Sequence, residues 1–410
     1  MNTENKISKN KSVLVTLPYE GQQAKELQYL VENFCGLVVH DFLKANDETE
    51  TKQTKVYVCG DLSTLPTSGM VYHIIEELSY NYNEEAKHHH QTISLGQVPI
   101  IVHNVGVYYR DFFNDGEDYF NQIEAEHTFQ DLTESTKPSK ALRKGIYLTE
   151  VSKQTTEANE EALHYYLLRC SSNLTGPTDN FRATDHKIIQ ALNEAVAQVF
   201  ETPTQLNHVL AQIYQNKKNV GPKSKETKAK IAAHSDKTKD MRKDGLIVFC
   251  TFYDQANFDQ LTPSKTDRYD WGYKGKSGLT SLHFKLKNSV EDNTLAKEFT
   301  VTLYPNSVFF IPLSTNRLYT HAIRPSVLNV DRIPTRMGYV VRCSKTEALY
   351  INEQAYIKEN DALVKLAPMT AETMADLRTS YYQENTTKDQ IAYGKVHFSM
   401  NSGDYLKPLY

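Results

Sequence analysis

Two histidines and an aspartate are spaced in this sequence as the ligands of a metal ion can be. His234 and Asp236 are separated by one residue, and His321 lies farther along the chain. Side chains alternate between faces in an extended segment, so His234 and Asp236 point the same way. Two imidazoles and one carboxylate form the ligand set of a mononuclear non-haem iron(II) site with open coordination positions. The short His-x-Asp pair also fits a solvated loop, so its context decides between the two interpretations.

Two arginines follow the candidate ligands. Arg336 and Arg342 bound the segment Arg-Met-Gly-Tyr-Val-Val-Arg, which has the apolar character of a strand. An even separation along a strand places both side chains on the same face. The planar guanidinium of arginine makes bidentate, charge-assisted bonds to carboxylates. We therefore expect one arginine to hold a dicarboxylate co-substrate near the metal, with Arg332 as the alternative to Arg336.

The elements that must position these side chains are mostly short strands. Runs rich in β-branched and aromatic residues recur after Gln97, with one clear helix at Asp185 to Phe200. Many short strands with few helices predict a sandwich or jelly roll. There is no Walker A loop and no G-x-G-x-x-G, which argues against an NTPase or a dinucleotide enzyme. The predicted strands are Gly145–Leu148, His164–Arg169, Leu246–Tyr253, Ser281–Leu286, Phe299–Leu303, Val308–Ile311 and Gly338–Arg342.

Composition and hydrophobic pattern divide the chain into four regions. We expect residues 1–11 to be a disordered tail, because they are polar and precede the first apolar run. Residues 12–97 alternate strand-like and helical patterns and predict a small α/β domain of unknown role. Residues 98–350 contain the strands and the candidate site. Residues 351–410 form a C-terminal extension that is partly helical, with an amphipathic pattern at Ala371 to Tyr382.

The bulk composition is that of an ordinary globular protein. The 410 residues are 40% hydrophobic and 23% charged, with a net charge of -4, which gives no overall attraction to nucleic acid or acidic lipid. The five cysteines form no C-x-x-C pair, so they indicate a reducing compartment rather than a disulfide framework or a zinc site. The polar N-terminus is unlike a signal peptide, and no run approaches the roughly 18 apolar residues of a membrane span. We expect a cytoplasmic or nuclear protein that does not enter a membrane.

The order of these residues resembles a known enzyme family. An H-x-D pair, a distant histidine and then R-x5-R is the pattern of the AlkB-like Fe(II)/2-oxoglutarate-dependent dioxygenases. The block Asn207-His-Val-Leu-Ala-Gln212-Ile-Tyr214 is similar to the N-x-x-L-x-N-x-Y strand that precedes the H-x-D pair in that family. Gln212 stands where the family has asparagine, a departure that keeps the amide but lengthens the side chain.

The resemblance covers roughly residues 100–350. It implies an α+β fold with a double-stranded β-helix (jelly-roll) oxygenase core, preceded by the small N-terminal α/β domain and followed by the helical tail. The stretch from His234 to His321 is long for the family, which predicts an insertion at about Asp254 to Lys276.

The resemblance also implies a set of roles. Iron(II) binds His234, Asp236 and His321, and 2-oxoglutarate and O2 are the co-substrates. Arg336 and Tyr214 hold the far carboxylate of 2-oxoglutarate, Arg342 lies near its keto-acid end, and Gln212 completes the set. The candidate site residues are therefore His234, Asp236 and His321 for the metal and catalysis, and Tyr214, Gln212, Arg336 and Arg342 for 2-oxoglutarate.

The oxidised substrate is left open by the sequence. Ten Lys or Arg residues and three acidic residues lie between Lys217 and Lys243. This basic stretch fits either a grip on a phosphate backbone or a flexible solvated loop. We expect hydroxylation or demethylation of a C–H bond in a modified nucleobase of nucleic acid or, alternatively, in a small molecule, an amino acid or a protein side chain. A third alternative, a non-catalytic binding protein on the same fold, is disfavoured by the intact ligand set.

Overall fold

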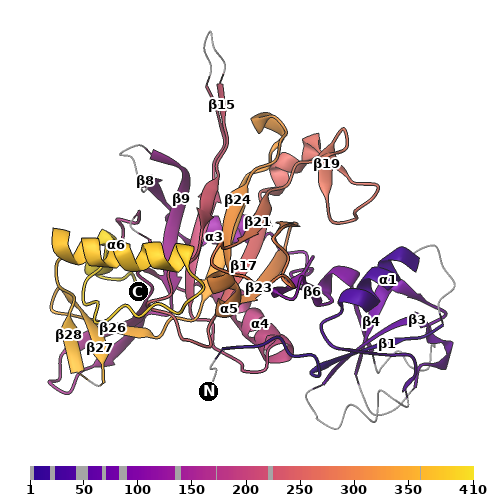
Figure 1. Cartoon of the computed structure of the whole chain (residues 1–410), viewed down its shortest axis with the longest axis horizontal. Coiled ribbons are helices and arrows are strands. Elements are labelled where there is room, and N and C mark those ends of the chain that lie inside the picture. Colours follow the sequence, from indigo (N-terminus) through magenta and orange to yellow (C-terminus); the bar gives the residue numbers. More distant parts are fainter. Residues whose placement is uncertain are drawn as a thin grey trace.

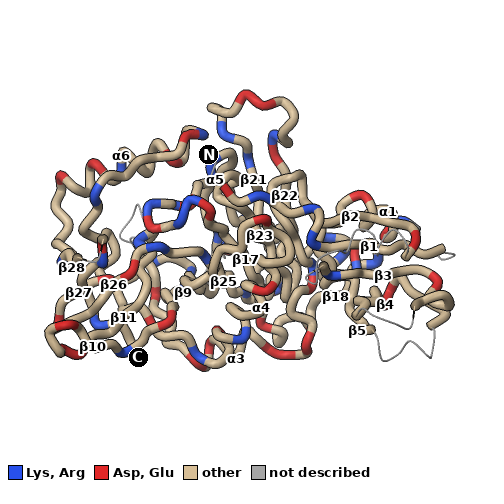
Figure 2. The backbone as a smooth tube through the Cα atoms, turned by 90° about the horizontal axis from the view of Figure 1, so that it is seen from below, with Lys and Arg blue, Asp and Glu red and all other residues tan. Residues whose placement is uncertain are grey.

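The chain is a strand-rich, mixed α/β protein. The computed structural model describes residues 4–18, 24–42, 54–66, 71–82, 90–133, 140–171, 173–219, 225–360 and 362–410. The N-terminal sheet, the central sheets and the C-terminal region follow one another along the long axis (Figure 1). Acidic and basic positions are interspersed along the chain (Figure 2), in keeping with the small net charge. Among the described residues, no helix is long and apolar enough to cross a membrane.

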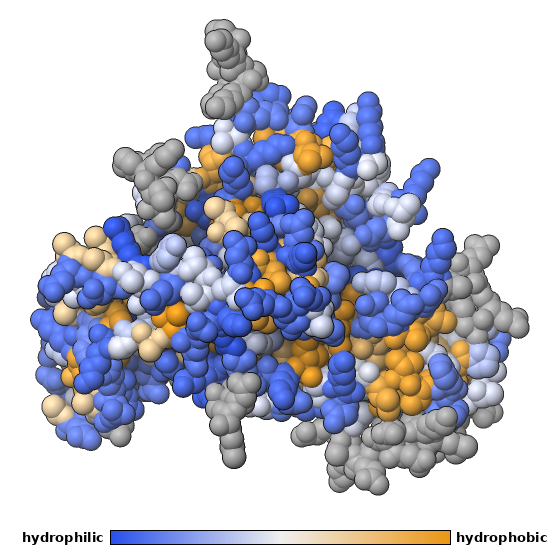
Figure 3. Space-filling view, viewed as in Figure 1, coloured by the Kyte–Doolittle hydropathy of each residue, from blue (hydrophilic) through white to orange (hydrophobic). Residues whose placement is uncertain are grey.

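The N-terminal region is built on a five-stranded parallel sheet. Its strands lie in the order β2-β1-β3-β4-β5, and each neighbouring pair is parallel. Helix α1 packs Leu30 against Leu14 and Tyr57 of the sheet, in a core that continues into the central sheets. Apolar residues also gather over this region on the face shown in Figure 3. The elements are β1 (Ser12–Thr16), α1 (Ala24–Asn33), β2 (Leu37–Val39), β3 (Lys55–Asp61), η1 (Leu62–Thr64), β4 (Tyr72–Tyr80), β5 (His90–Ile93) and η3 (Leu95–Gln97).

A nine-stranded sheet forms the centre of the molecule. Its strands lie in the order β12-β9-β13-β25-β17-β23-β7-β6, and β8 pairs with β9 outside this path. Helices α3 and α4 share one core with Val209, Val248 and Val341 of the sheet, so they cover one of its faces. The elements are β6 (Ile100–Val102), β7 (Gly106–Tyr109), α3 (Tyr119–Glu126), β8 (Gln130–Thr133), β9 (Lys140–Thr149), β12 (Asp179–Asn180), α4 (Ala183–Val199), β13 (His208–Tyr214), β17 (Leu246–Tyr253), β23 (Ser307–Pro312) and β25 (Arg336–Arg342).

A four-stranded sheet covers the other face of the nine-stranded sheet. Its strands lie in the order β16-β24-β21-β22. Phe284 and Tyr319 of the small sheet share a core with Phe249 and Phe309 of the large one. The rings of Phe284 and Phe309 meet edge to face, with centroids 5.9 Å apart. The elements are β16 (Ile231–His234), β21 (Ser281–Leu286), β22 (Glu298–Thr302), α5 (Leu313–Leu318), β24 (Tyr319–Arg324) and η5 (Val330–Arg332).

Four neighbouring strands of the large sheet and the four strands of the small sheet form an eight-stranded antiparallel set. In chain order they are β13, β16, β17, β21, β22, β23, β24 and β25. Strands β13, β25, β17 and β23 (first, eighth, third and sixth in chain order) lie side by side in the large sheet. Strands β16, β24, β21 and β22 (second, seventh, fourth and fifth) lie side by side in the small sheet. Every neighbouring pair among them is antiparallel. The chain therefore crosses repeatedly between the layers, which places β16 and β25 on opposite walls of one interior.

The start of the chain differs from the expected disordered tail. Asn5 is buried, and its amide donates to the carbonyl of Thr202 at 2.5 Å. Ile7 forms a short antiparallel bridge with Phe200, just after α4. The described part of the tail, from residue 4, therefore closes the end of α4. Its partners lie almost two hundred residues away, which its polar composition does not reveal.

The C-terminal extension contains strands as well as the predicted helix. Strands β26, β27 and β28 join β10 and β11 in a sheet of order β10-β11-β26-β27-β28. The helix predicted at Ala371 to Tyr382 lies within α6, whose buried residues are Leu377, Tyr381 and Glu384. The elements are β10 (Ser152–Thr155), β11 (Glu161–Leu167), β26 (Thr346–Ile351), β27 (Gln354–Glu359), β28 (Ala362–Lys365), α6 (Ala371–Thr386) and η6 (Ser402–Tyr405).

Two excursions leave the central sheets. The predicted insertion contains η4 (Gln255–Gln260) and a small sheet of β18 (Thr262–Pro263), β19 (Trp271–Tyr273) and β20 (Lys276–Ser277). A hairpin of β14 (Lys217–Asn219) and β15 (Lys225–Thr227) projects from the central sheets at the top of Figure 1. Residues 220–224 of the basic stretch lie outside the described residues.

Candidate metal centre

The candidate metal ligands meet on neighbouring strands of the small sheet. His234 ends β16 and is the cross-strand partner of His321 on β24, with ring centroids 4.5 Å apart. Asp236 Oδ1 lies 3.4 Å from His234 Nε2 and 3.5 Å from His321 Nε2. The three ligand atoms lie within 4.8 Å of one another. Strand pairing thus joins residues that are far apart in the sequence.

Arg342 holds the Asp236 carboxylate through Oδ2, the oxygen that does not face the histidines. Arg342 donates from Nε and Nη2 to Asp236 Oδ2 at 2.8 and 2.6 Å, which leaves Oδ1 directed at the histidines. Asn316 fixes the backbone, because its Oδ1 accepts from Asp236 N at 2.8 Å and its Nδ2 donates to Asp236 O at 2.9 Å. Burial alone would raise the pKa of Asp236, but the charge of Arg342 together with the smaller effects of His234 and His321 outweighs it and holds the pKa well below its usual range. Asp236 is therefore ionised and oriented as a ligand.

Both histidines present Nε2 to the aspartate. His234 Nδ1 lies 3.0 Å from Ala232 O, a carbonyl that can only accept, so in the neutral imidazole Nδ1 carries the proton and Nε2 has a free lone pair. His321 is buried, and its Nδ1 has no partner among the described residues. Burial and then the charge of His234 lower the pKa of His321. A neutral imidazole is the form that binds a metal ion.

The donor set suits a transition metal. Imidazole nitrogens favour zinc, copper, iron and nickel, whereas magnesium and calcium prefer all-oxygen ligands. In the described part of the chain, no fourth His, Cys, Asp or Glu joins this group. Three protein ligands leave positions at which small molecules can coordinate.

A cavity of about 540 Å³ opens beside the three ligands. Its walls come from both facing sheets and from α6. Apolar side chains such as Leu210, Phe249 and Ile323 limit the access of water to its interior. Among the described lining residues, Asp236 is the one acidic side chain, whereas five are cationic: Arg143, Lys237, Arg336, Arg342 and Arg378.

Arg336 is a buried cation in this cavity with unused donors. It is 3% exposed, and its Nε and Nη2 have no hydrogen-bond partner among the described residues. Its guanidinium lies over the ring of Tyr214, 4.0 Å from the centroid, and the Tyr214 hydroxyl donates to Gln212 Oε1 at 3.3 Å. Gly338 leaves room for this group, since a Cβ there would lie 3.0 Å from Arg336 Nη1. Burying an unpaired charge costs free energy, so this arrangement is prepared for an anion.

Of the other residues singled out from the sequence, Arg332 and Asn207 do not line the cavity, whereas Arg342 does. Arg332 stacks on Tyr273, 3.8 Å from the ring centroid, and does not line the cavity. Asn207 exchanges hydrogen bonds of 3.0 and 2.8 Å with the backbone of Ser344, just after β25. Arg342, expected near the keto-acid end of a co-substrate, uses two of its donors on Asp236, and its Nη1 has no hydrogen-bond partner among the described residues.

The basic stretch does not form one continuous patch within the described residues. Lys217 and Lys218 are exposed on the β14–β15 hairpin. Lys239 is buried and donates to Arg169 O at 2.8 Å. Lys237 lies over the ring of Tyr381, 4.3 Å from the centroid, and lines the cavity. The charge of the stretch is therefore divided between an exposed hairpin and the interior.

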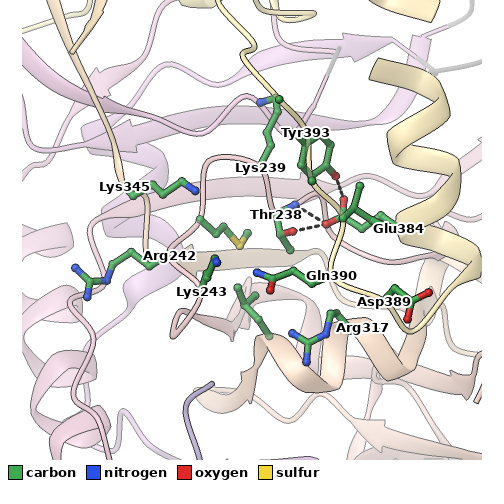
Figure 4. Close-up of a pocket in the computed structure, with 15 residues that line it drawn as sticks. Thr238, Lys239, Arg242, Lys243, Arg317, Lys345, Glu384, Asp389, Gln390 and Tyr393 are labelled. Atoms are coloured by element: carbon green, nitrogen blue, oxygen red, sulfur yellow. Dashed lines mark hydrogen bonds between the residues drawn. The ribbon is translucent and has the colours of Figure 1, made fainter. Parts of the chain in front are cut away.

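Helix α6 supplies two residues that sequence reasoning missed. Asn385 Oδ1 accepts from Ser235 N at 2.8 Å, and Glu384 Oε1 accepts from Thr238 N at 3.0 Å. Glu384 also bonds the hydroxyls of Thr238 and Tyr393 (Figure 4). The loop that carries Asp236 is thus fastened on both sides of the ligand. No local pattern marks these residues, because their contacts span sequence separations of 150 and 146.

A second cavity, of about 340 Å³, lies behind this loop (Figure 4). Its lining mixes Lys243 and Lys345 with Glu384 and Asp389. Charges of both signs share one small space, so the cavity favours no single class of ligand.

Another histidine–carboxylate cluster lies on the helix-covered face of the large sheet. His127 Nδ1 and Nε2 lie 2.8 Å from Asp179 Oδ2 and 2.8 Å from Asp185 Oδ2. The Tyr339 hydroxyl donates to the other oxygen of Asp185 at 2.7 Å. Burial would lower the pKa of His127, but the two carboxylates outweigh it and raise the pKa to about 9. His127 is therefore an imidazolium with both nitrogens engaged.

Comparisons with known proteins do not assign a family. No protein-family model matches the chain, and no curated protein matches it. A solved chain described as the structure of OsALKBH1 shares 12% sequence identity, with 58% of this chain and 96% of that chain covered and a TM-score of 0.31. At this degree of overlap the likeness assigns neither an activity nor a substrate. The function is therefore argued from the site itself.

Proposed function

We propose that this chain is an Fe(II)- and 2-oxoglutarate-dependent dioxygenase on a double-stranded β-helix (jelly-roll) core. The observation that carries the proposal is the convergence of His234, Asp236 and His321 on the cavity in which Arg336 is buried without a partner. A metal site and an anion site in one enclosure suit a dicarboxylate that chelates the metal. The order of the eight antiparallel strands supports the jelly roll.

Each residue has a separate task in this proposal. His234, His321 and Asp236 Oδ1 hold the iron, which supplies the redox chemistry that couples decarboxylation of 2-oxoglutarate by O2 to oxidation of a substrate C–H bond. Arg342 keeps Asp236 ionised and turns Oδ1 toward the histidines.

The co-substrate is held at the other end of the cavity. Arg336 takes the distal carboxylate through its free Nε and Nη2. Tyr214 supports the guanidinium from below, and Gln212 orients the Tyr214 hydroxyl.

The experiment that tests this assignment compares two arginines. Arg336→Met should raise the 2-oxoglutarate concentration needed for half-maximal succinate release by about thirtyfold or more, the cost of removing one partner of a buried charge pair. Iron binding should not change, because Arg336 does not contact the metal ligands. Arg332→Met, which removes a stacked arginine outside the cavity, serves as the control. If only the Arg332 variant changes the requirement, the wrong arginine has been assigned; if wild type releases no succinate, the reaction class is wrong.

Two substrate classes remain in the proposal. A modified nucleobase in nucleic acid is favoured by the exposed Lys217 and Lys218 on the projecting hairpin, since phosphate backbones bind exposed cations. A small molecule, amino acid or protein side chain is favoured by the burial of Lys239 and by cations within the cavity, such as Arg143. Absence of binding to a single-stranded oligonucleotide at low salt would exclude the first class. Succinate release with metabolites or peptides, and none with alkylated oligonucleotides, would establish the second.

A further inference from the structure

A second cleft lies between the N-terminal sheet and the central sheets. It has a volume of about 430 Å³. Its lining residues include Tyr29 of α1, Tyr269 of the insertion and Arg110, which follows β7. No described residue lines both this cleft and the cavity at the metal centre. Clefts of this size at domain interfaces are common sites for small molecules.

The walls of the cleft are fixed by specific contacts. Arg268 of the insertion makes a two-pronged bond to Glu26 of α1 at 2.9 and 2.8 Å and reaches Glu77 of β4 at 3.2 Å. The Tyr304 hydroxyl donates to Asp267 at 2.6 Å, which ties the insertion to the central sheets. These contacts join three parts of the chain around the cleft and engage the carboxylates that line it.

Arg110 faces this cleft without a counter-charge in the described part of the chain. Its Nε and Nη2 are buried and have no hydrogen-bond partner there. Its guanidinium carbon lies 4.6 Å from the centroid of the Tyr269 ring and 5.6 Å from that of Tyr29. Burial and then the charge of Glu77 raise the pKa of the adjacent carboxyl, Asp111, to about 6. Stacking on two rings positions the guanidinium but satisfies none of its donors.

The Tyr269 hydroxyl is a second unpaired polar group in the same cleft. It is buried and has no hydrogen-bond partner among the described residues. Its ring is held close to the backbone, since a Cβ on Gly96 would come within 2.9 Å of it. Buried polar groups cost free energy unless they are hydrogen-bonded. Two of them in one cleft, on segments fixed by other contacts, indicate that a ligand completes the site.

We propose that this cleft binds a small anion that carries a flat ring. The fork of Arg110 takes a carboxylate or a phosphate group in two hydrogen bonds, and Tyr269 supplies a third. The rings of Tyr108 and Tyr304 stack with centroids 6.0 Å apart and offer an aromatic wall for the ring of the ligand. The ligand contacts both the N-terminal region and the central sheets. This gives residues 12–97 a task that is independent of the metal centre.

Calorimetric titration of the full chain tests the proposal. Adenosine 5′-monophosphate and benzoate serve as the ring-bearing phosphate and carboxylate, and adenosine and benzyl alcohol serve as their neutral counterparts. At least one of the two anions should bind saturably, and its neutral counterpart about tenfold or more weaker. The anion that binds shows whether the site takes a phosphate or a carboxylate.

Variants place the binding in the cleft. Arg110→Met should lower the affinity for the bound anion by about tenfold or more. Arg332→Met, which removes another tyrosine-stacked arginine, should leave the affinity unchanged. His234→Ala should also leave it unchanged, so a failure at the metal centre is distinguished from a failure here.

Thermal unfolding separates a binding role from a structural one. Without a probe, Arg110→Met should keep or raise the melting temperature, because the variant removes a partly buried charge whose Nε and Nη2 have no hydrogen-bond partner among the described residues. With the probe, wild type should be stabilised and the variant should not. The proposal is overturned if neither anion binds saturably, if Arg110→Met binds as wild type does, or if the variant alone melts at a lower temperature.

Discussion

The metal centre and the His127 cluster use the same residue types with different results. In the His127 cluster each ring nitrogen lies 2.8 Å from a carboxylate, and the carboxylates also accept from Arg182 and Tyr339. At the metal centre Asp236 Oδ1 lies 3.4 and 3.5 Å from two imidazoles, beyond good hydrogen-bonding distance, and faces a cavity. Proximity of histidine and carboxylate is therefore not what marks a metal site. A candidate metal site is distinguished by ligand atoms whose lone pairs are directed at one shared cavity.

The largest expected effect comes from removing a metal ligand. His234→Ala or Asp236→Ala should weaken Fe(II) binding by more than about a hundredfold, because even outer-shell partners of metal ligands contribute about 10- to 100-fold. The absorption of the Co(II)-substituted protein measures this without any turnover. His127→Ala is the matched control and should bind Co(II) as wild type does. Unchanged metal affinity in either ligand variant would refute the site.

The control variant His127→Ala should lose folding stability rather than metal affinity. His127→Ala leaves Asp185 buried without its cation, although Asp179 keeps Arg182, and breaking a buried charge pair in this way costs about 3–5 kcal/mol of folding free energy. Denaturant unfolding of the metal-free protein measures the change. His234→Ala, at a partly exposed position, should lower the free energy of unfolding far less. Equal losses in the two variants would remove the distinction between the clusters.

The His127 cluster should also respond to alkali. Its pKa is raised from 6.5 to about 9, so the stabilisation is fully present below pH 6.5 and is lost as the pH rises through about 9. This rise in pKa corresponds to about 3 kcal/mol of folding free energy, at about 1.4 kcal/mol for each tenfold change in proton affinity. The difference in unfolding free energy between wild type and His127→Ala should therefore shrink across this interval. A constant difference from pH 6 to 9.5 would show that His127 is not charged in the folded protein.

The smallest expected effect concerns the helix that fastens the ligand loop. Asn385→Ala removes the acceptor for Ser235 N and should weaken metal binding by about tenfold, as for other outer-shell partners. Glu372→Ala, at an exposed position on the same helix, should have no effect. Asn385→Asp keeps an acceptor at this position and should restore most of the affinity. Loss of affinity in the Glu372 variant would point to the helix as a whole rather than to this contact.

The sequence predicted the parts of the site that have a local pattern. The alternation of side chains along a strand placed His234 with Asp236 and Arg336 with Arg342, and the structure brings these four residues to one cavity. The contact between Arg342 and Asp236 could not be predicted from the sequence, because it depends on which acidic side chain the fold places beside the arginine. The pairing of His127 with Asp179 and Asp185, and the hold of α6 on the ligand loop, depend on contacts between distant segments of the chain.

The fold was predictable to a similar depth. Short apolar runs in the second half of the chain correspond to β17, β21, β23 and β25. The parallel order of the N-terminal sheet and the packing of residues 4–11 were not predictable, since neither leaves a periodic signal. Pairing partners are chosen by the whole core, and a single strand carries little information about its neighbour.

The attachment of α6 to the ligand loop has a consequence for the order of events during synthesis. Ser235 leaves the ribosome before Asn385, with a sequence separation of 150 between them. At about 5–20 residues per second, the loop waits roughly 8–30 seconds for the helix that secures it. A nascent chain therefore has its three metal ligands before it can hold them in place. In the proposed enzyme, secure metal binding therefore waits until α6 has been synthesised.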